Sequence, residues 1–135
     1  MGSFAFIVHP VEISDVARKF RVAKYLPGKL VEHALKLVPP FKLSEITGVK
    51  SEYGNASGWF ISCPLTPAMM LRMPEDKVIK KIIDAAKVAQ DLGAKIVGLG
   101  AFTAVVGDAG ITVSQNVDIA VTTGNSYTVA TAIEG

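Results

Sequence analysis

Residues 73–100 limit the possible folds more than any other stretch, because an amphipathic helix there leads directly into an apolar strand. Pro74 opens the helix, and acidic residues follow near the positive end of the helix dipole. Apolar residues then recur at helical spacing over residues 78–89, and Gly93 ends the helix. Residues 95–100 form a short apolar run that predicts a buried strand. A helix leading into a buried strand indicates an α/β domain.

The rest of the chain continues this alternation of strands and helices. Patterns that predict strands lie at residues 4–8, 43–50, 59–63 and 117–121. Helical patterns begin near Val16, Leu30 and Tyr127. Residues 53–58 have the composition of a hairpin loop between two of the strands. We therefore predict an α/β, three-layer domain with a mostly parallel sheet plus one β-hairpin.

The composition allows one folded domain and excludes several classes of protein. A chain of 135 residues can bury one core without covalent support. Its single cysteine excludes a disulfide scaffold, and a hydrophobic share of 50% excludes intrinsic disorder. No uncharged run reaches the roughly 18–20 apolar residues of a membrane span, and residues 1–10 lack the features of a signal peptide. We therefore expect a single cytoplasmic domain over residues 1–135.

Charge is distributed unevenly along the chain. Residues 16–42 hold seven basic side chains against one acid, whereas no lysine or arginine follows Lys95. The uncharged C-terminal part is either surface hidden against another domain or subunit, or the central strands of a parallel sheet. The basic stretch could attract an acidic partner or nucleic acid, but it has few aromatic residues and its charges lie on helix exteriors. This favours a solvated face, and we expect no nucleic-acid partner.

Residues 98–103 follow a strand and partly match a dinucleotide-binding fingerprint, with Asp118 where a ribose-binding acid could lie. Thr103 stands in place of the third glycine. Residues 104–110 are too short and too interrupted by glycine for the helix that should hold a pyrophosphate. We therefore interpret this segment as a tight turn on the substrate side and expect no cofactor site in this chain.

Cysteine and histidine, frequent nucleophiles and metal ligands, are scarce in this sequence. Cys63 ends a strand with no nearby basic residue in the sequence to lower its pKa, which favours a buried structural thiol over a nucleophile. His33 lies on the polar side of a helix, whereas His9 follows a strand and is the better candidate. We expect His9, Cys63 and Phe102 to line a cleft, and we expect no metal site.

Residues 122–128 are the most informative stretch for a binding site. A strand ends there in hydroxyl side chains, a glycine turn follows, and a helix begins with Asn125 or Ser126 as its cap. Open α/β sheets bind ligands in loops at the carboxyl ends of strands, although an ordinary capped helix start has the same local chemistry. The substrate-binding residues predicted from this loop are Thr122, Thr123, Gly124, Asn125 and Ser126, and Thr103 joins them from the turn at residues 98–103. We expect Thr103, Thr123 and Asn125 to converge at one cleft although they come from two different loops.

Four segments together resemble a known family. They are residues 58–63, the helix that ends at Leu92 and Gly93, residues 99–103 and residues 122–128. The sequence there is similar to the N-terminal part of the long-chain acyl-[acyl carrier protein] reductases and of related dehydrogenases of amino-acid or shikimate type. The resemblance covers about residues 55–135, and its more specific motifs are Leu-Gly-Ala-Phe-Thr and Thr-Thr-Gly-Asn-Ser.

The resemblance implies a two-domain NAD(P)-dependent oxidoreductase. Residues 1–135 would form its substrate-binding N-terminal domain, with an amino-acid-dehydrogenase-like fold, and an NADP-binding Rossmann domain is expected after residue 135. The substrate cleft would lie between the two domains. The cysteine that carries the acyl group in this family also lies beyond Gly135, so the resemblance gives Cys63 no nucleophilic role. The chain alone is expected to lack reductase activity and not to bind NADPH.

Three functions stay open at this point. In the first, the parent enzyme reduces an acyl thioester of acyl carrier protein or coenzyme A to an aldehyde, and the lack of basic residues after Lys95 favours it. In the second, the substrate is an amino acid or a shikimate-like hydroxy acid, since residues 64–67 and 107–110 depart from the family pattern. The third is a non-enzymatic protein-interaction domain. A homo-oligomer is compatible with each. The cations that could dock an acidic acyl carrier protein are Arg18, Lys19, Arg21, Lys24 and Lys29.

Overall fold

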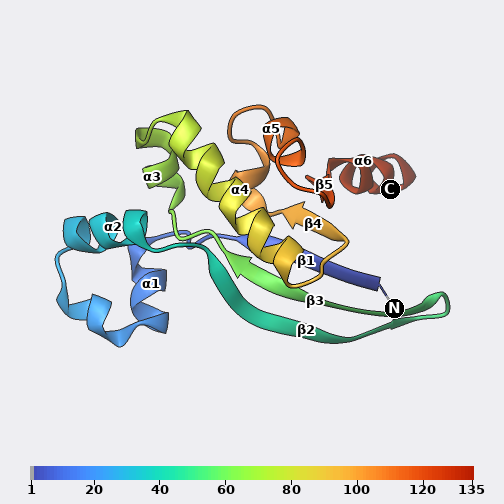
Figure 1. The fold of residues 1–135 in the computed structure, drawn as a ribbon, viewed down its shortest axis with the longest axis horizontal. Helices are drawn as coiled ribbons and strands as arrows, with labels where there is room; N and C mark the ends of the chain where they lie inside the picture. Colours follow the sequence, from blue (N-terminus) through green and yellow to red (C-terminus); the bar gives the residue numbers. More distant parts are fainter. Residues whose placement is uncertain (1) are drawn as a thin grey trace.

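The computed structural model describes residues 2–135, and a five-stranded sheet with β1 (Gly2–Val8) at its centre organises the fold (Figure 1). The other strands are β2 (Phe41–Ser51), β3 (Gly54–Ser62), β4 (Ile96–Leu99) and β5 (Ala120–Thr122). The strand order is β2-β3-β1-β4-β5. β1 pairs in parallel with β3 and β4, and β4 pairs in parallel with β5, whereas β2 and β3 form an antiparallel hairpin. The predicted α/β class, the mostly parallel sheet and the single hairpin are confirmed.

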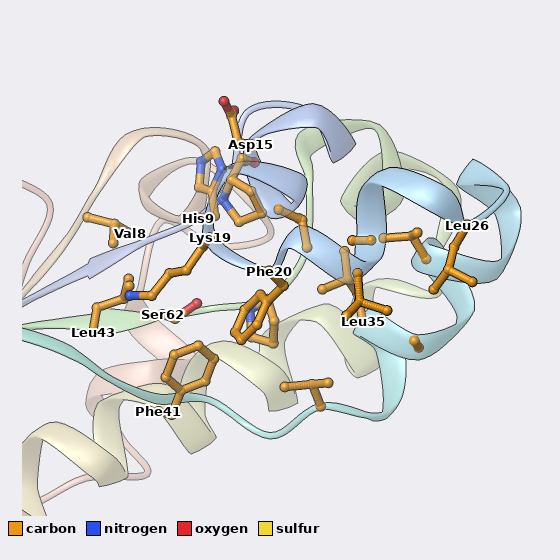
Figure 2. Close-up of a pocket in the computed structure, with 18 residues that line it drawn as sticks. Val8, His9, Asp15, Lys19, Phe20, Leu26, Leu35, Phe41, Leu43 and Ser62 are labelled. Atoms are coloured by element: carbon orange, nitrogen blue, oxygen red, sulfur yellow. Dashed lines mark hydrogen bonds between the residues drawn. The ribbon is translucent and has the colours of Figure 1, made fainter.

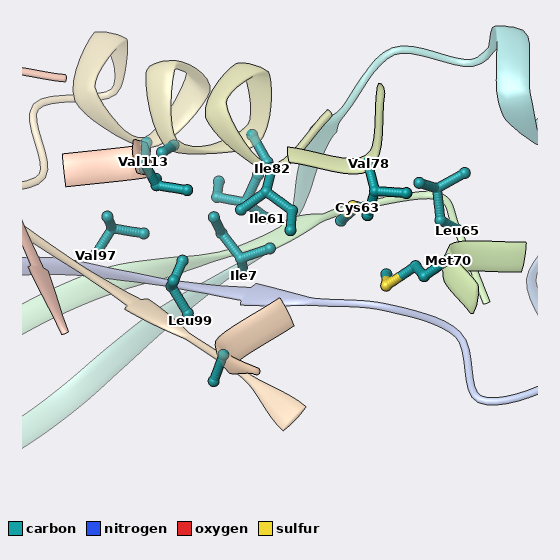
Figure 3. Packing of buried hydrophobic residues seen from close by; sticks show 14 of the residues in the cluster. Ile7, Ile61, Cys63, Leu65, Met70, Val78, Ile82, Val97, Leu99 and Val113 are labelled. Atoms are coloured by element: carbon teal, nitrogen blue, oxygen red, sulfur yellow. The ribbon is translucent and has the colours of Figure 1, made fainter. Parts of the chain in front are cut away.

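Three helices pack together on one face of this sheet. The long helix α4 (Glu75–Asp91) lies across β1 and β3, with α3 (Pro67–Arg72) and α5 (Ile111–Ser114) beside it. Figure 3 shows Val78 and Ile82 of α4 above Ile7 and Ile61 of the sheet, all of them at most 1% exposed. The hydrophobic core therefore lies between α4 and the central strands.

A second group of helices lies beyond the carboxyl ends of β1 and β3 (Figure 1). It consists of α1 (Ile13–Lys19), the 3-10 helix η1 (Arg21–Tyr25) and α2 (Gly28–Leu37). The Lys81 ammonium of α4 donates hydrogen bonds to the carbonyl oxygens of Lys36 and Val38, at 2.9 and 2.6 Å. Burial lowers the pKa of Lys81 below its usual value. These bonds satisfy carbonyls at the end of α2 and hold α2 against α4.

The remaining elements differ in part from what the sequence predicts. The loop predicted over residues 53–58 is wrong, because β3 already begins at Gly54 and only Glu52 and Tyr53 form the turn. After β4 the chain forms the short 3-10 helix η2 (Ala101–Ala104), and after β5 it forms α6 (Asn125–Glu134). Every side chain of α6 is exposed. Within residues 2–135, no helix combines the length and the apolar character needed to cross a membrane.

The face of the sheet opposite α4 is largely uncovered. Strand alternation places Phe6, Phe60 and Ile96 on this face, and these side chains are 44%, 37% and 39% exposed. The helices α1, η1 and α2 approach it only at the carboxyl ends of β1 and β3. The second helical layer is therefore confined to one end of the sheet.

Candidate functional site

A cavity of about 450 Å³ lies between α1, η1 and α2 on one side and the carboxyl ends of β1 and β3 on the other (Figure 2). Its walls are almost entirely apolar. The side chains that define its shape include Val16, Phe20, Ala23, Leu35, Phe41 and Leu43. Carboxyl ends of strands are where α/β sheets bind ligands, so the cavity has both the position and the size of a small-molecule site.

The cavity arises because α1 ends at Lys19 and the chain changes direction before η1 begins at Arg21. Val16 lies on α1, and Phe20 is the extended residue that follows the last turn of this helix. The 3-10 helix η1 then turns Ala23 toward the same space. On α2, Val31 and Leu35 are four residues apart, and both are buried. These apolar side chains converge, but they leave a volume that no side chain among residues 2–135 fills.

Two of the polar side chains at the cavity, those of His9 and Asp15, form hydrogen bonds with the backbone. His9 Nε2 accepts a hydrogen bond from the Phe102 N–H at 3.1 Å, so this nitrogen carries no proton, and Nδ1 then donates to the Pro10 carbonyl at 3.0 Å. Asp15 Oδ2 accepts from the N–H groups of Val11 and Glu12, each at 3.1 Å. His9 and Asp15 therefore fix the loop that follows β1.

Lys19 is different from these two residues. Among residues 2–135, the structure gives its ammonium no hydrogen bond and no ion pair, and Figure 2 shows its side chain extending along the cavity toward Leu43. The hydroxyl-bearing side chain of Ser62 also lines the cavity and is 7% exposed. The cavity thus combines an apolar lining that is open to solvent, where Phe20 is 52% and Leu26 41% exposed, with the positive charge of Lys19.

A second, basic depression is lined by residues of α1 and η1. It is lined by Arg18, Arg21, Lys24 and Tyr25, together with Ser14 and Ala17. The Arg18 guanidinium lies 3.6 Å from the Asp15 carboxylate and its side chain is 84% exposed. A pair so exposed to solvent leaves the depression positively charged. Four of the five cations expected to dock an acidic partner lie at this depression or at the cavity.

Of the side chains predicted from sequence as site residues, His9 lines the cavity. Phe102, also predicted to line the cleft, is not among the residues that line this cavity, and only its backbone N–H bonds to His9. Thr103 is 1% exposed, and its hydroxyl donates to the Gly100 carbonyl at 2.7 Å, so it stabilises the turn of η2. The parallel pairing of β4 and β5 places η2 and the residues after Thr122 at the same edge of the sheet. Their convergence on one ligand stays a prediction.

The loop after β5 differs from its predicted geometry. Gly124 occupies the N-cap position of α6 in the left-handed region, with φ of 77°, so the predicted side-chain cap by Asn125 or Ser126 is wrong. The Thr122 hydroxyl accepts a hydrogen bond from the Gly124 N–H at 3.1 Å. A glycine suits this position because left-handed φ values strain residues that carry a Cβ. Thr123 is half-buried, and Asn125 and Ser126 are exposed in the first turn.

Gly98 and Gly100 have structural roles that do not suit a dinucleotide. A methyl group on Gly98 would lie 2.5 Å from the Phe6 ring, and one on Gly100 would lie 2.5 Å from the Ile7 carbonyl oxygen. Both glycines therefore permit close packing within the sheet. The element that follows them is a 3-10 helix of four residues rather than a helix that could bind a pyrophosphate. Residues 98–104 therefore lack the turn and helix start that hold a pyrophosphate, and residues 2–135 hold no cluster of three or more His, Cys, Asp or Glu side chains suited to a metal ion.

Cys63 lies in the core rather than at the cavity, with no exposed surface. Burial raises the pKa of its thiol to about 12. At neutral pH the side chain is therefore a thiol and not the thiolate that a nucleophile requires.

We expect Cys63 in the native chain to react with Ellman's reagent at least about a hundredfold more slowly than in the chain unfolded in urea, because it is both buried and protonated. The thiol of the unfolded chain ionises at about pH 8.5, whereas the thiol of the native chain keeps its proton to higher pH. The free energy of unfolding should therefore fall as the pH rises above about 8.5, because ionisation of Cys63 stabilises only the unfolded chain. In Cys63→Ala, which has no thiol, this contribution to the decrease should be absent. Rapid labelling of the native chain would contradict the buried placement.

Comparisons with known proteins do not identify a function for this chain. No protein-family model matches the chain, and no curated protein matches it either. The resemblance to the acyl-[acyl carrier protein] reductases therefore stays an expectation that rests on the residues quoted for it.

Proposed function

We propose that this chain is the substrate-binding domain of an NAD(P)-dependent oxidoreductase that reduces an acyl thioester to an aldehyde, and that the acyl chain occupies the apolar cavity. The observation that supports this is the cavity lining, in which Val16, Phe20 and Leu35 are typical residues. Each CH₂ group moved from water into such a lining contributes about 0.8 kcal/mol to binding. A volume of about 450 Å³ lies in the range of ordinary ligand pockets.

The same lining disfavours the alternative substrates. An amino acid or a shikimate-like hydroxy acid carries several hydrogen-bonding groups, and each of them needs a partner when it is buried. At the cavity, both ring nitrogens of His9 and Asp15 Oδ2 already bond to the backbone, and Asp15 Oδ1 faces Arg18. The other polar side chains there are those of Lys19 and Ser62. A substrate with one polar end and a long apolar part matches this distribution better than a small polar molecule.

The roles we propose for this chain are binding and orientation of the substrate. The Rossmann domain expected after residue 135 would hold the reduced cofactor, NADPH or NADH, which supplies the hydride and is oxidised to NADP⁺ or NAD⁺. Lys19 would attract the polar end of the substrate. An acyl carrier protein, which is acidic, would dock in the cytoplasm at the basic depression formed by Arg18, Arg21 and Lys24.

Calorimetric titration of the chain with hexadecanoyl-coenzyme A tests the proposal, with coenzyme A alone as the comparison ligand. We expect hexadecanoyl-coenzyme A to bind and Ala23→Trp to weaken it by about tenfold or more, because the indole would fill the cavity. Ala132→Trp on the exposed helix α6 is the matched control and should leave the affinity unchanged.

The proposal fails if the wild-type chain does not bind hexadecanoyl-coenzyme A, or if Ala23→Trp binds it as tightly as the wild type does. Binding of shikimate or of free amino acids that Ala23→Trp abolishes would favour the second function instead.

A further inference from the structure

The uncovered face of the sheet is uncharged across all five strands. By strand register, the residues that share this face with Phe6 include Phe4, Ile46, Phe60, Ile96 and Ala120. Its other positions are glycine, alanine, serine, threonine, valine and phenylalanine, with no charged residue among them. Monomeric proteins rarely expose an apolar patch of more than a few hundred Å², and larger patches mark interaction sites.

Two glycines make this face flat. A methyl group on Gly58 would lie 2.8 Å from the Phe4 ring, and one on Gly98 would lie 2.5 Å from the Phe6 ring. The rings of Phe4 and Phe6 therefore lie close to the neighbouring strands instead of projecting away from the sheet. Phe6 also packs near Phe60, with ring centroids 6.3 Å apart. A flat aromatic surface of this kind can pack face to face against another sheet at a distance of about 10 Å.

We propose that this face binds the same face of a second copy of the chain, so that two sheets pack back to back in a two-fold dimer. An interface that pairs a surface with itself must be self-complementary, and a face without charge meets no like charge in its copy. A charged partner would instead have its ionised groups desolvated against a surface that offers them no counter-charge. This inference is independent of the function proposed above.

The size of the face supports a dimer. Five strands about 4.8 Å apart and seven residues of about 3.3 Å each give a projected area on the order of 500 Å². Two such faces would bury roughly 1,000 Å² in total, which reaches the lower bound for a biological interface, although it is below the about 800 Å² per partner of a standard one. The helices α1 and α2 lie beyond the carboxyl ends of the strands in Figure 1. If the strands of the two copies run antiparallel, the α1 and α2 helices of each copy lie past the amino ends of the partner's strands and do not block the contact.

Sedimentation equilibrium over a range of chain concentrations tests the dimer. We expect the wild-type chain to approach twice its mass of 14.3 kDa. Phe60→Lys and Ile96→Lys, each at a partly exposed site, should raise the dimer dissociation constant by about tenfold or more, because like charges would meet across the two-fold axis. Leu71→Lys, on the 75% exposed leucine of α3, is the matched control and should leave the dissociation constant unchanged.

A cross-link locates the interface in a second experiment. Phe6 lies on the central strand, close to where a two-fold axis through the face would pass, so Phe6→Cys should form a disulfide between copies under mild oxidation. The native Cys63 is buried and gives no background, and Leu71→Cys should remain monomeric on a non-reducing gel. A wild-type chain that stays monomeric, or a dimer that both lysine variants leave intact, would overturn the proposal. So would a monomer that binds phosphatidylcholine vesicles in a manner that depends on Phe60.

Discussion

Replacing Gly58 with alanine is expected to lower the free energy of unfolding by about 3 kcal/mol. The new methyl group would meet the Phe4 carbonyl oxygen on the adjacent strand and lie 2.8 to 2.9 Å from two carbons of the Phe4 ring. The carbonyl belongs to the backbone of β1 and pairs within the sheet, so it cannot move without disturbing the parallel register of β1 and β3. Urea denaturation followed by far-UV circular dichroism measures the change.

Gly28→Ala is the control for this prediction. Gly28 is the first residue of α2, and the nearest atom to a methyl group there would be Ile13 Cδ1 at 3.7 Å, an ordinary contact. Alanine favours helix over glycine by up to about 1 kcal/mol, so this variant should be as stable as the wild type or more stable. Equal stabilities for Gly58→Ala and Gly28→Ala would contradict the close approach of β1 and β3 at Gly58.

The sequence predicts best those elements whose side-chain pattern is strong. The helix expected to begin at Pro74 and to end by Gly93 is observed as α4, because its apolar stripe is packed on the sheet as the spacing requires. In contrast, residues 54–58 have the composition of a loop and nevertheless extend β3, because hydrogen bonds to β2 hold them without apolar side chains. Residues 56–58 also pair in parallel with β1, so backbone pairing that the composition does not indicate places them in the sheet.

The helix α3 was not predicted, although a signal for it exists in the sequence. Pro64 and Pro67 together indicate the end of a strand, which conceals the second role of Pro67 as the first residue of a helix. The Thr66 hydroxyl accepts a hydrogen bond from the Met69 N–H at 3.3 Å and so caps that helix. A threonine followed by proline before an apolar segment is the pattern that could have identified α3.

The cavity could not be predicted from sequence, because its walls come from segments far apart in the chain. Phe20 lies before η1 and Phe41 begins β2, and nothing in either neighbourhood indicates that the two side chains share one space. We predict a binding site at residues 122–126 because the hydroxyl groups and the glycine of this loop are adjacent in the sequence. Local chemistry can be read from neighbouring residues, whereas an apolar cavity is a property of how distant elements pack.

Truncation of Ile82 to alanine is expected to lower the free energy of unfolding by about 3–4 kcal/mol, since large-to-small changes at fully buried sites lose transfer free energy and leave a cavity. Ile82 is 1% exposed and lies between α4 and the central strands beside Ile61 (Figure 3). The next buried residues of α4 are Ala85, Ala86 and Ala89, which have no longer side chains that could move into the space. Urea denaturation should show a lower midpoint with an unchanged slope.

Ile133→Ala provides the comparison, because Ile133 is 80% exposed on α6 and its truncation should change stability by no more than about 0.5 kcal/mol.

Lys81 is next to Ile82 on α4 and bonds to the end of α2. Loss of packing at Ile82 therefore also tests whether the shape of the cavity depends on α4. If α2 is anchored to α4 only through these bonds, hexadecanoyl-coenzyme A should bind the folded Ile82→Ala chain as tightly as it binds the wild type. A large loss of affinity in the folded variant would show instead that the α4 core sets the shape of the cavity.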